Sequence, residues 1–274
     1  MRRLVDYIVF PSMRFLEFLL LALTSAVNAS GLLDTAWGRR AFLTAYRIYK
    51  RITDWQIFFL LKKFVPEGSN VIDVGANVGV ITLWAAKCVG ESGQVIAIEP
   101  ELKNIQALKD CIKSAGMADR VLVYEAVAAD IPGTLNLRIN RAHPADHRID
   151  SEGVPVQAVS LDGVVDSMGL TSVAFVKIDV QGAEPLVLQG AKNLLRSLRP
   201  VLWVEVSEFD LKNFSSTPQE VLDFLESYDF VPHLLQGRAI IPATYVDIMF
   251  RLTKRGYTDV LFIPVERIIQ ADTI

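Results

Sequence analysis

The spacing of hydrophobic residues changes repeatedly along the chain after residue 69. Val71, Ile72 and Val74 form a short β-branched run, which is typical of a strand buried in a parallel sheet. Residues 80–88 then carry apolar side chains at helical spacing. Short apolar runs and helix-period segments continue to alternate toward the carboxyl terminus. The pattern predicts an α/β fold with a mostly parallel sheet.

The same analysis gives the later elements. Strands are expected at residues 94–98, 120–127, 134–139, 154–159, 173–178, 200–206, 228–235 and 257–263, and helices at 101–115, 184–198 and 245–252. A further helix is expected to start near residue 217, with Thr217 as N-cap, Pro218 in the first position and Glu220 completing a capping box.

A glycine-rich turn joins the first strand to the first helix. It reads Asp73-x-Gly75-x-x-x-Gly79, which differs from the Gly-x-Gly-x-x-Gly of a dinucleotide site. Glycine removes a Cβ that would hold a ligand off the backbone or clash in the turn. The following helix can offer N–H groups to an anionic ligand group. Strand 94–98 leads to Glu99, and an acid at this tip is placed to accept the ribose hydroxyls of an adenosine group. A turn that only packs helix on sheet is the alternative interpretation.

A second polar stretch follows the apolar run at 173–178. Lys177 lies near the end of that strand, Asp179 lies at its tip, and the next helix begins at Glu184. The following strand carries Glu205 near its carboxyl end. Because the carboxyl ends of parallel strands meet at one edge of a sheet, the three carboxylates are expected to converge there.

Composition narrows the class of protein. The 274 residues are 51% hydrophobic and 22% charged, which is enough for one large α/β domain and an appendage. The formal net charge of −3 excludes a general nucleic-acid binder. Cys88 and Cys111 lack a metal-ligand spacing, so both are expected to be inert thiols in a reducing compartment.

The amino-terminal segment differs from the rest of the chain. Up to Lys63 the formal charge is +6, which leaves −9 for the remainder. An apolar run at 15–27 is too short to span a bilayer, and residues 41–64 mix aromatic residues with Lys and Arg. These features favour helices on an anionic membrane surface, on the cytoplasmic side. The alternatives are a cleaved signal peptide and helices that pack on the domain or cover its site. We divide the chain into a helical segment of residues 1–65 and an α/β domain of residues 66–274.

Five motifs occur in a fixed order and carry a family resemblance. They are Asp73-Val-Gly75-Ala-Asn77-Val-Gly79-x-x-Thr82, Glu99-Pro100, Ser160-Leu-Asp162, Lys177-Ile-Asp179-Val-Gln-Gly182-Ala-Glu184 and Pro200-x-Leu-x-x-Glu205. Together they resemble the FkbM-type family of class I S-adenosylmethionine (SAM) methyltransferases. Its members act mostly on hydroxyls of polyketides, sugars and glycolipids. The resemblance covers roughly residues 70–207.

The resemblance implies a fold and a cofactor. The fold is a Rossmann-like sheet of seven strands, with helices on both faces and the last strand antiparallel, to which the amino-terminal helical appendage is added. The implied cofactor is SAM, and NAD is the minor alternative. The residues expected to bind SAM are Asp73, Gly75, Ala76, Asn77, Gly79, Thr82, Glu99, Pro100, Ala126, Val127 and Asp179.

Methyl transfer to a hydroxyl sets further requirements. The nucleophile, the methyl group and the sulfur must be held in line, and a base must remove the hydroxyl proton. Asp179, Glu184 and Glu205 are the candidate catalytic residues, and their proximity would raise their pKa values toward neutral pH. Alternatively they bind a divalent metal that acidifies the hydroxyl. Glu184 could instead cap its helix while Glu205 pairs with a basic neighbour, or the base could be His143 or His147 on a loop.

The sequence therefore predicts a SAM-dependent methyltransferase. Its expected acceptor is a hydroxyl of a lipid, glycolipid or lipid-linked intermediate at a membrane surface. One alternative is an O-methyltransferase of a soluble sugar or polyketide-type metabolite. Another is a membrane-tethered SAM-binding protein without catalytic activity.

Overall fold

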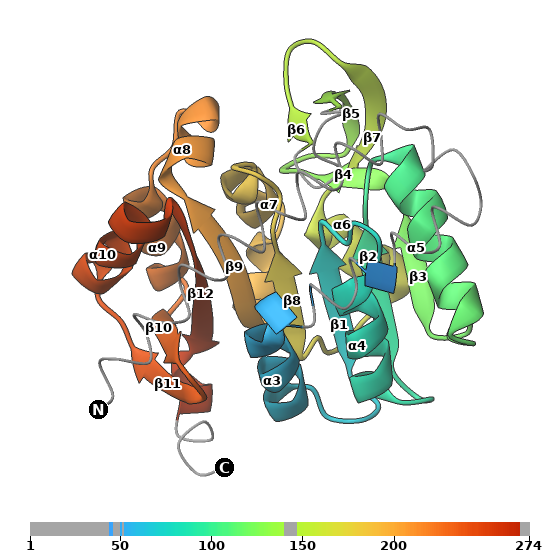
Figure 1. Cartoon of the computed structure of the whole chain (residues 1–274), viewed down its shortest axis with the longest axis horizontal. Coiled ribbons are helices and arrows are strands. Elements are labelled where there is room, and N and C mark those ends of the chain that lie inside the picture. Colours follow the sequence, from blue (N-terminus) through green and yellow to red (C-terminus); the bar gives the residue numbers. More distant parts are fainter. Residues whose placement is uncertain (1–43, 46–49, 51, 140–146, 269–274) are drawn as a thin grey trace. The chain divides into compact units, whose positions relative to one another are not determined.

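The computed structural model describes residues 44–45, 50, 52–139 and 147–268. A compact unit begins at Gln56 and contains two β-sheets (Figure 1). The sequence-based boundary after residue 65 stays a prediction.

The main sheet has eight strands in the order β11-β10-β12-β9-β8-β1-β2-β3. The run from β9 to β3 is parallel, whereas β12 is antiparallel to both β9 and β10. The bounds are β1 (Asn70–Val74), β2 (Gln94–Ile98), β3 (Val121–Tyr124), β8 (Phe175–Ile178), β9 (Val201–Ser207), β10 (Phe230–Gln236), β11 (Ala239–Pro242) and β12 (Tyr257–Pro264). The central strands are buried on both faces, which explains their nearly continuous apolar sequences.

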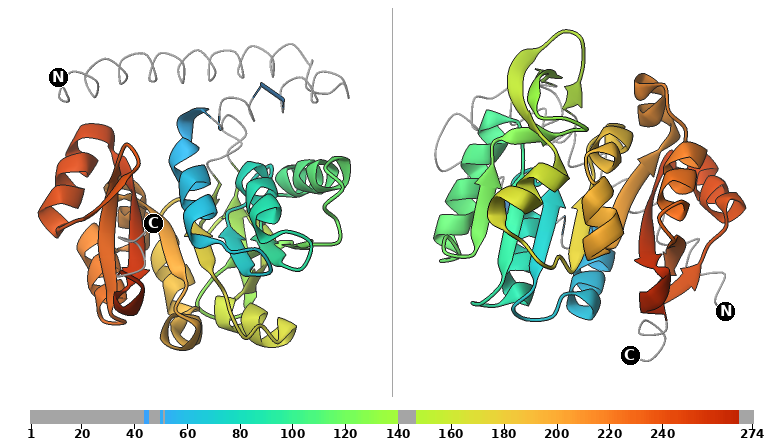
Figure 2. Two further views of the ribbon diagram at one scale, coloured as in Figure 1. Left: turned by 90° about the horizontal axis from the view of Figure 1, so that it is seen from below. Right: turned by 180° about the vertical axis from the view of Figure 1, so that it is seen from behind.

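Helices cover both faces of the main sheet. Figure 2 shows α3, α4 and α5 on one face and α6 and α9 on the other. The bounds are α3 (Trp55–Phe64), α4 (Val80–Val89), α5 (Leu102–Ser114), α6 (Leu161–Met168), α7 (Glu184–Gln189), α8 (Glu208–Leu211), α9 (Pro218–Glu226) and α10 (Tyr245–Arg255). Ile72 and Val74 of β1 belong to the core that contains the buried side chains of α6 and α9. Because side chains alternate along a strand, Asp73 points to the other face, and Lys177 is its register partner on β8.

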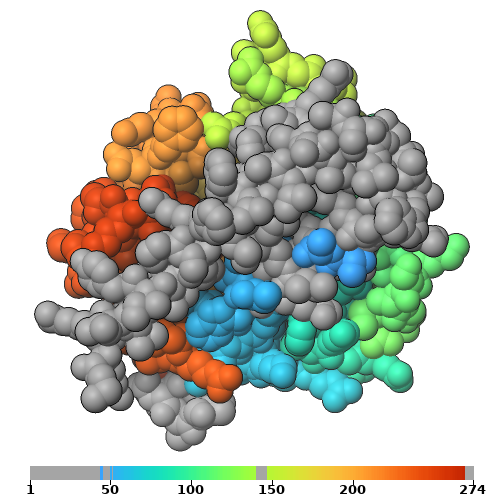
Figure 3. Space-filling view, in the orientation of Figure 1, coloured from blue at the N-terminus to red at the C-terminus, as the bar shows by residue number. Residues whose placement is uncertain are grey.

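A small sheet stands at the carboxyl end of the parallel strands. Its order is β4-β7-β5-β6, and its own core comprises Val127, Ala129, Leu137 and Ala158. The bounds are β4 (Ala126–Ala128), β5 (Gly133–Arg138), β6 (Arg148–Ile149) and β7 (Val154–Val159). Its yellow-green surface projects at the top of the space-filling view (Figure 3).

The structure confirms the α/β class with helices on both faces, and it corrects three details. The main sheet has eight strands, where seven were expected. The strand expected at 120–127 ends at Tyr124, because residues 126–128 leave the main sheet to pair with β7. The helix expected at 184–198 is interrupted after Gln189, and a π-helical turn follows at Leu194–Leu198. At the interruption, a Cβ on Gly190 would lie 2.0 Å from the carbonyl oxygen of Ala129, so this position requires glycine.

The predicted membrane helix at 15–27 lies outside the described residues, as do residues 41–43, 46–49 and 51 of the segment 41–64. The carboxyl-terminal part of that segment is described and forms α3, which buries Ile57, Phe58, Leu60 and Leu61. This part therefore packs on the domain, as the alternative interpretation expected. Among the helices that the structure does describe, none is both long and apolar enough to cross a membrane.

The predicted start of α9 is confirmed. Thr217 Oγ1 accepts from the Glu220 N–H at 3.3 Å, and Glu220 Oε2 accepts from the Thr217 N–H at 3.0 Å. Pro218 occupies the first helical turn. Both bonds satisfy N–H groups that the helix itself leaves unpaired.

We expect Thr217→Ala to lower the free energy of unfolding by about 1 kcal/mol, since it removes the hydroxyl that caps α9. Urea denaturation measures the change. Thr217→Ser is the matched control and should stay close to the wild type. Equal losses in both variants would show that the threonine methyl group, rather than the cap, is responsible.

Candidate functional site

The first component of the site is the turn between β1 and α4. Asp73 is fully buried, and its Oδ2 accepts from the Thr82 hydroxyl at 2.6 Å. The N–H groups of Gly75 and Ala76 donate to the Ile98 carbonyl at 3.0 and 3.1 Å, which ties the turn to the end of β2. Thr82 is itself fully buried, so it anchors Asp73 from the first turn of α4.

Two positions of this turn require glycine, Gly75 by backbone packing and Gly79 by its left-handed conformation. Gly75 has φ +75°, and a Cβ on it would lie 2.0 Å from the carbonyl oxygen of Asp179. Gly79 has φ +84°, and a Cβ there would lie 2.4 Å from Leu108 Cδ1 on α5. The turn is therefore pressed against both the β8–α7 turn and α5. From the sequence, two reasons for glycine are expected here, close approach of a ligand and a clash within the turn. These contacts show a clash within the fold.

Glu99 links the glycine turn to the start of α5. Its Oε2 accepts from the Asn77 N–H at 2.8 Å, and its Oε1 accepts from the Glu101 N–H at 3.0 Å and from Asn104 Nδ2 at 3.3 Å. Burial raises the pKa of Glu99, and the three N–H donors and the Lys177 charge oppose that rise. Pro100 follows Glu99 and is partly buried. The carboxyl group is thus fixed in orientation before any ligand arrives.

Lys177 forms the floor of the site. Its buried ammonium donates to the Gly75 carbonyl at 2.7 Å and to the Val74 carbonyl at 3.3 Å. Its Nζ also lies 3.6 Å from Asp73 Oδ1 and 3.4 Å from Asp179 Oδ2. One cation therefore joins the ends of β1 and β8 and holds Asp179 at the carboxyl edge, where 31% of the aspartate side chain is exposed.

Glu184 lies beneath the β8–α7 turn. Its Oε1 accepts from the N–H groups of Val180 and Gly182, both at 3.2 Å. The side chain is buried, and its Oε2 has no hydrogen-bond partner among the described residues. Burial raises the pKa of Glu184 to about 7, with a smaller contribution from the charge of Asp179. The sequence predicted the proximity of these two carboxyl groups, but the geometry favours Glu184 as a support for the turn.

Glu205 lies in a row of acidic residues. In the β8–β9 register, Ile178 is paired with Val204. The next residue along each of these two segments is an acid, Asp179 after β8 and Glu205 in β9. Across the sheet, Glu205 is paired with Asp259 of β12. Sequence reasoning missed Asp259, because nothing local in the sequence specifies how β12 aligns with β9.

The acidic row is no metal centre. Within the described ranges, no group of three or more His, Cys, Asp or Glu side chains could hold a metal ion. His147 immediately precedes β6, and His143 lies outside the described residues.

The small sheet and α8 close the site on its other sides. Ala126 and Val127, predicted to approach the adenine ring, are buried in β4, where Val127 packs in the core of the small sheet. Arg148 of β6 pairs with Asp210 of α8, with Nη2 2.8 Å from Oδ1. A Cβ on Gly182 would lie 2.3 Å from the Asp210 carbonyl oxygen. The β8–α7 turn, α8 and the small sheet are thus in mutual contact.

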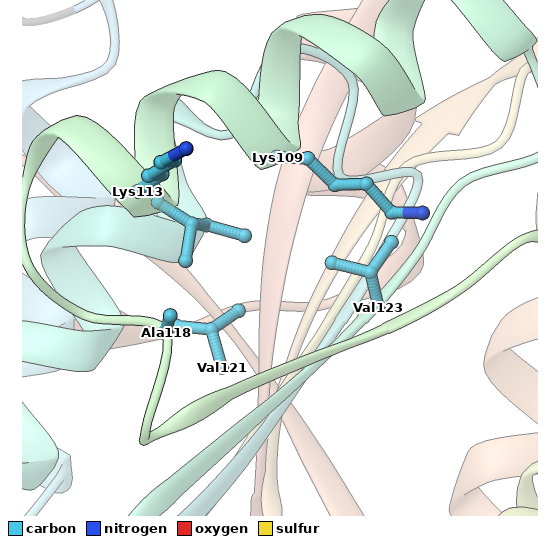
Figure 4. A pocket seen from close by; sticks show the side chains of 6 residues that line it. Lys109, Lys113, Ala118, Val121 and Val123 are labelled. Carbon is cyan, nitrogen blue, oxygen red and sulfur yellow. The ribbon is translucent and has the colours of Figure 1, made fainter.

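A pocket of about 270 Å³ lies away from these turns, between α5 and β3. Figure 4 shows Lys109 and Lys113 of α5 beside Val121 and Val123 of β3. Val121 begins β3, at the end of the strand opposite to the carboxyl edge. This pocket therefore belongs to a different part of the molecule from the predicted site residues.

Several known proteins are similar to the chain. The 2-O-methyltransferase NoeI of Sinorhizobium fredii is 25% identical over 219 residues, which are 73% of this chain and 84% of that protein. The crystal structure of methyltransferase FkbM from Methylobacillus flagellatus has 16% identity and a TM-score of 0.45, and covers 72% of this chain and 44% of its own. Fibrillarin of Aeropyrum pernix, solved with natively bound SAM, has 11% identity and a TM-score of 0.43, and covers 76% of this chain and 73% of its own.

A model of the methyltransferase FkbM domain matches residues 73–232, which is more than half of the chain. The protein is therefore a SAM-dependent methyltransferase. It belongs to the FkbM methyltransferase family. The matched range contains Asp73, Glu99, Asp179 and Glu205, and it ends within β10.

The residues of the site fit SAM by their chemistry. A carboxylate has about four lone-pair sites, and Glu99 accepts from three protein N–H groups, so it retains capacity for a ribose hydroxyl. Gly79 provides no side-chain cap for α4, so the first turn of this helix would offer N–H groups to the cofactor carboxylate. The individual roles of these residues stay predictions.

We expect Lys177→Met to lower the free energy of unfolding by about 3–5 kcal/mol, because it leaves the buried Asp73 carboxylate without its cation. Chemical denaturation measures the loss. The exposed Lys113→Met is the control and should change the free energy by about 0.5 kcal/mol or less. Similar values for the two variants would contradict a structural role of the buried ammonium.

The raised pKa of Glu184 predicts a pH dependence of stability. Between pH 4.5 and about 7 the native state keeps a proton that the unfolded state has lost, so the free energy of unfolding falls as the pH rises through this window. The amide of Glu184→Gln cannot ionise. Above pH 7 the free energy of unfolding of this variant, relative to that of the wild type, should therefore rise by up to about 3 kcal/mol.

Urea denaturation from about pH 5 to about pH 8 measures this difference. The exposed Glu226→Gln on α9 is the control. If the wild-type and Glu184→Gln curves run parallel over this range, Glu184 does not change its protonation on unfolding.

Proposed function

We propose that the protein transfers the methyl group of SAM to a hydroxyl of a lipid, glycolipid or lipid-linked intermediate at the cytoplasmic side of a membrane. The observation that carries the chemical part is the position of Asp179, partly exposed at the carboxyl edge and held there by Lys177. The name of the relative NoeI, a 2-O-methyltransferase, supports a hydroxyl acceptor.

Asp179 is the proposed base. SAM supplies an electrophilic methyl group on a sulfonium sulfur. With SAM bound, the acceptor oxygen would take the methyl group as the carbon–sulfur bond breaks, and the Asp179 carboxylate would accept the hydroxyl proton. Lys177 Nζ lies 3.4 Å from Asp179 Oδ2 and holds this carboxylate in place.

The neighbouring carboxyl groups have different proposed tasks. Glu184 holds the turn that carries Asp179, since it binds the N–H groups of Val180 and Gly182. Glu205 and Asp259 add negative charge beside the position where the acceptor would lie. Most of the rate enhancement would come from positioning, because in-line displacement depends on the alignment of the reacting atoms.

The lipid acceptor rests on the charge distribution of the chain. Residues 1–63 carry a formal charge of +6 and residues 64–274 carry −9. A basic, apolar segment joined to an acidic domain suits attachment to anionic lipid headgroups. In this proposal residues 1–65 contact the membrane and residues 66–274 perform the methyl transfer.

The test is transfer of labelled methyl from SAM to total lipid and to water-soluble metabolite fractions by the full chain. We expect label in the lipid fraction. We also expect Asp179→Asn to reduce kcat by at least about 100-fold while S-adenosylhomocysteine binds with similar affinity in calorimetry. Glu99→Ala should abolish that binding and therefore serves as the cofactor-site control.

Other outcomes separate the alternatives. Label only in the water-soluble fraction would replace the lipid acceptor with a soluble sugar or polyketide-type metabolite. Binding of S-adenosylhomocysteine without methyl transfer to either fraction would favour a non-catalytic SAM-binding protein. Binding of NAD in its place would overturn the cofactor.

A further inference from the structure

Helix α10 is apolar on two sides. It buries Ile248 and Leu252, which pack in the main core. A second stripe, of Val246 and Phe250, points away from the core and is 72% and 60% exposed. An amphipathic surface helix normally presents polar residues on its outer side. Exposed apolar side chains that gather on one helix face therefore indicate an interaction surface.

Aromatic and basic residues complete this surface. We call it the α10 face and define it by Tyr245, Val246, Phe250, Lys254 and Tyr257. Tyr245 and Tyr257 are 37% and 46% exposed and lie just at the start and just beyond the end of the helix. Lys254 Nζ lies 4.1 Å from the ring centroid of Phe250, so the ammonium and the ring form one mixed patch.

The charge around the α10 face is opposite to that of its domain. Between Gly237 and Gly256 there are four basic residues and one acidic residue, whereas residues 64–274 together carry −9. The helix itself carries three of the basic residues, Arg251, Lys254 and Arg255, and one acidic residue, Asp247. Apolar side chains beside cations match the boundary between acyl chains and anionic headgroups, where Lys extends its charge toward the headgroups.

The α10 face ends at the edge of the sheet that carries the proposed base. Tyr257 is paired with Ser207, the last residue of β9. The pair Asp259–Glu205 lies two residues away from this pair on both strands. Because side chains alternate along a strand, both pairs lie on the same face of the sheet. In the space-filling view the red-orange surface of α10 lies beside the orange surface of the segment that follows β9 (Figure 3).

This surface is also outside the part of the chain that the family model matches. The match ends at residue 232, so β11 and α10 lie beyond it. We therefore do not attribute the α10 face to the shared requirements of cofactor binding.

We propose that the α10 face binds an anionic lipid surface and brings the carboxyl edge of the sheet, with Asp179, toward the headgroups. A hydroxyl in the headgroup layer would then reach the methyl group without leaving the membrane. The inference rests on the proposed lipid acceptor for its purpose, but lipid binding is measured without methyl transfer.

The experiment is co-sedimentation of the full chain with vesicles that contain phosphatidylglycerol, compared with vesicles of phosphatidylcholine alone. We expect binding to the anionic vesicles that weakens with added salt. Phe250→Ser and Lys254→Glu should each weaken that binding about tenfold, through loss of apolar burial and of charge attraction respectively.

Matched controls lie elsewhere on the surface. Ile131→Ser removes another apolar side chain that is 69% exposed, and Lys113→Glu reverses an exposed charge on α5. Both controls should bind within about twofold of the wild type. All four variants change exposed side chains, and thermal unfolding verifies that they fold.

Three results would overturn the proposal. The first is a wild-type chain that does not bind anionic vesicles. The second is binding that the α10 variants leave unchanged. The third is an α10 face that holds a second copy of the chain, which sedimentation velocity would reveal as a dimer that Phe250→Ser dissociates without any effect on vesicle binding.

The same variants separate this inference from the proposed function. Lipid methylation together with unchanged vesicle binding of Phe250→Ser would refute the α10 face and leave the acceptor class standing. If the chain binds vesicles through α10 but methylates only water-soluble compounds, the lipid acceptor is refuted and the α10 face stands.

Discussion

The ammonium of Lys177 is the interaction on which the site depends. A lysine is costly to bury unless anions and carbonyl groups replace its water. Here Asp73, Asp179 and the carbonyls of Val74 and Gly75 surround it. These groups come from the ends of two adjacent strands and from the turn after one of them. The charge therefore holds β1, β8 and the glycine turn in one arrangement, and displacement of any of them would expose an unbalanced charge in the interior.

Close backbone packing adds a second constraint. The β1–α4 turn meets the β8–α7 turn where Gly75 faces the Asp179 carbonyl. The β8–α7 turn in turn meets α8 where Gly182 faces the Asp210 carbonyl. Side chains at these two contacts would separate the turns by the width of a Cβ. The β1–α4 turn, the β8–α7 turn and α8 are thus joined through peptide groups, which are much stiffer than side chains.

The sequence predicts the local parts of this structure well and the non-local parts poorly. The turn at Asp73–Gly79, the acid Glu99 and the cap at Thr217 each follow from residues close together in the chain. Asp259 and the departure of β4 from the main sheet depend on which strands pair and in what register, and a single strand sequence does not encode its partner. The support role of Glu184 depends on burial, which the sequence alone does not reveal.

The small sheet with its separate core has a consequence for how members of such a family could diverge. Val127, Leu137 and Ala158 pack with one another, and the register of the eight-stranded sheet does not depend on them. Substitutions that repack this small core would therefore leave unchanged the strand register that positions Lys177 and Glu99. The small sheet can thereby change in sequence while the frame of parallel strands stays constant.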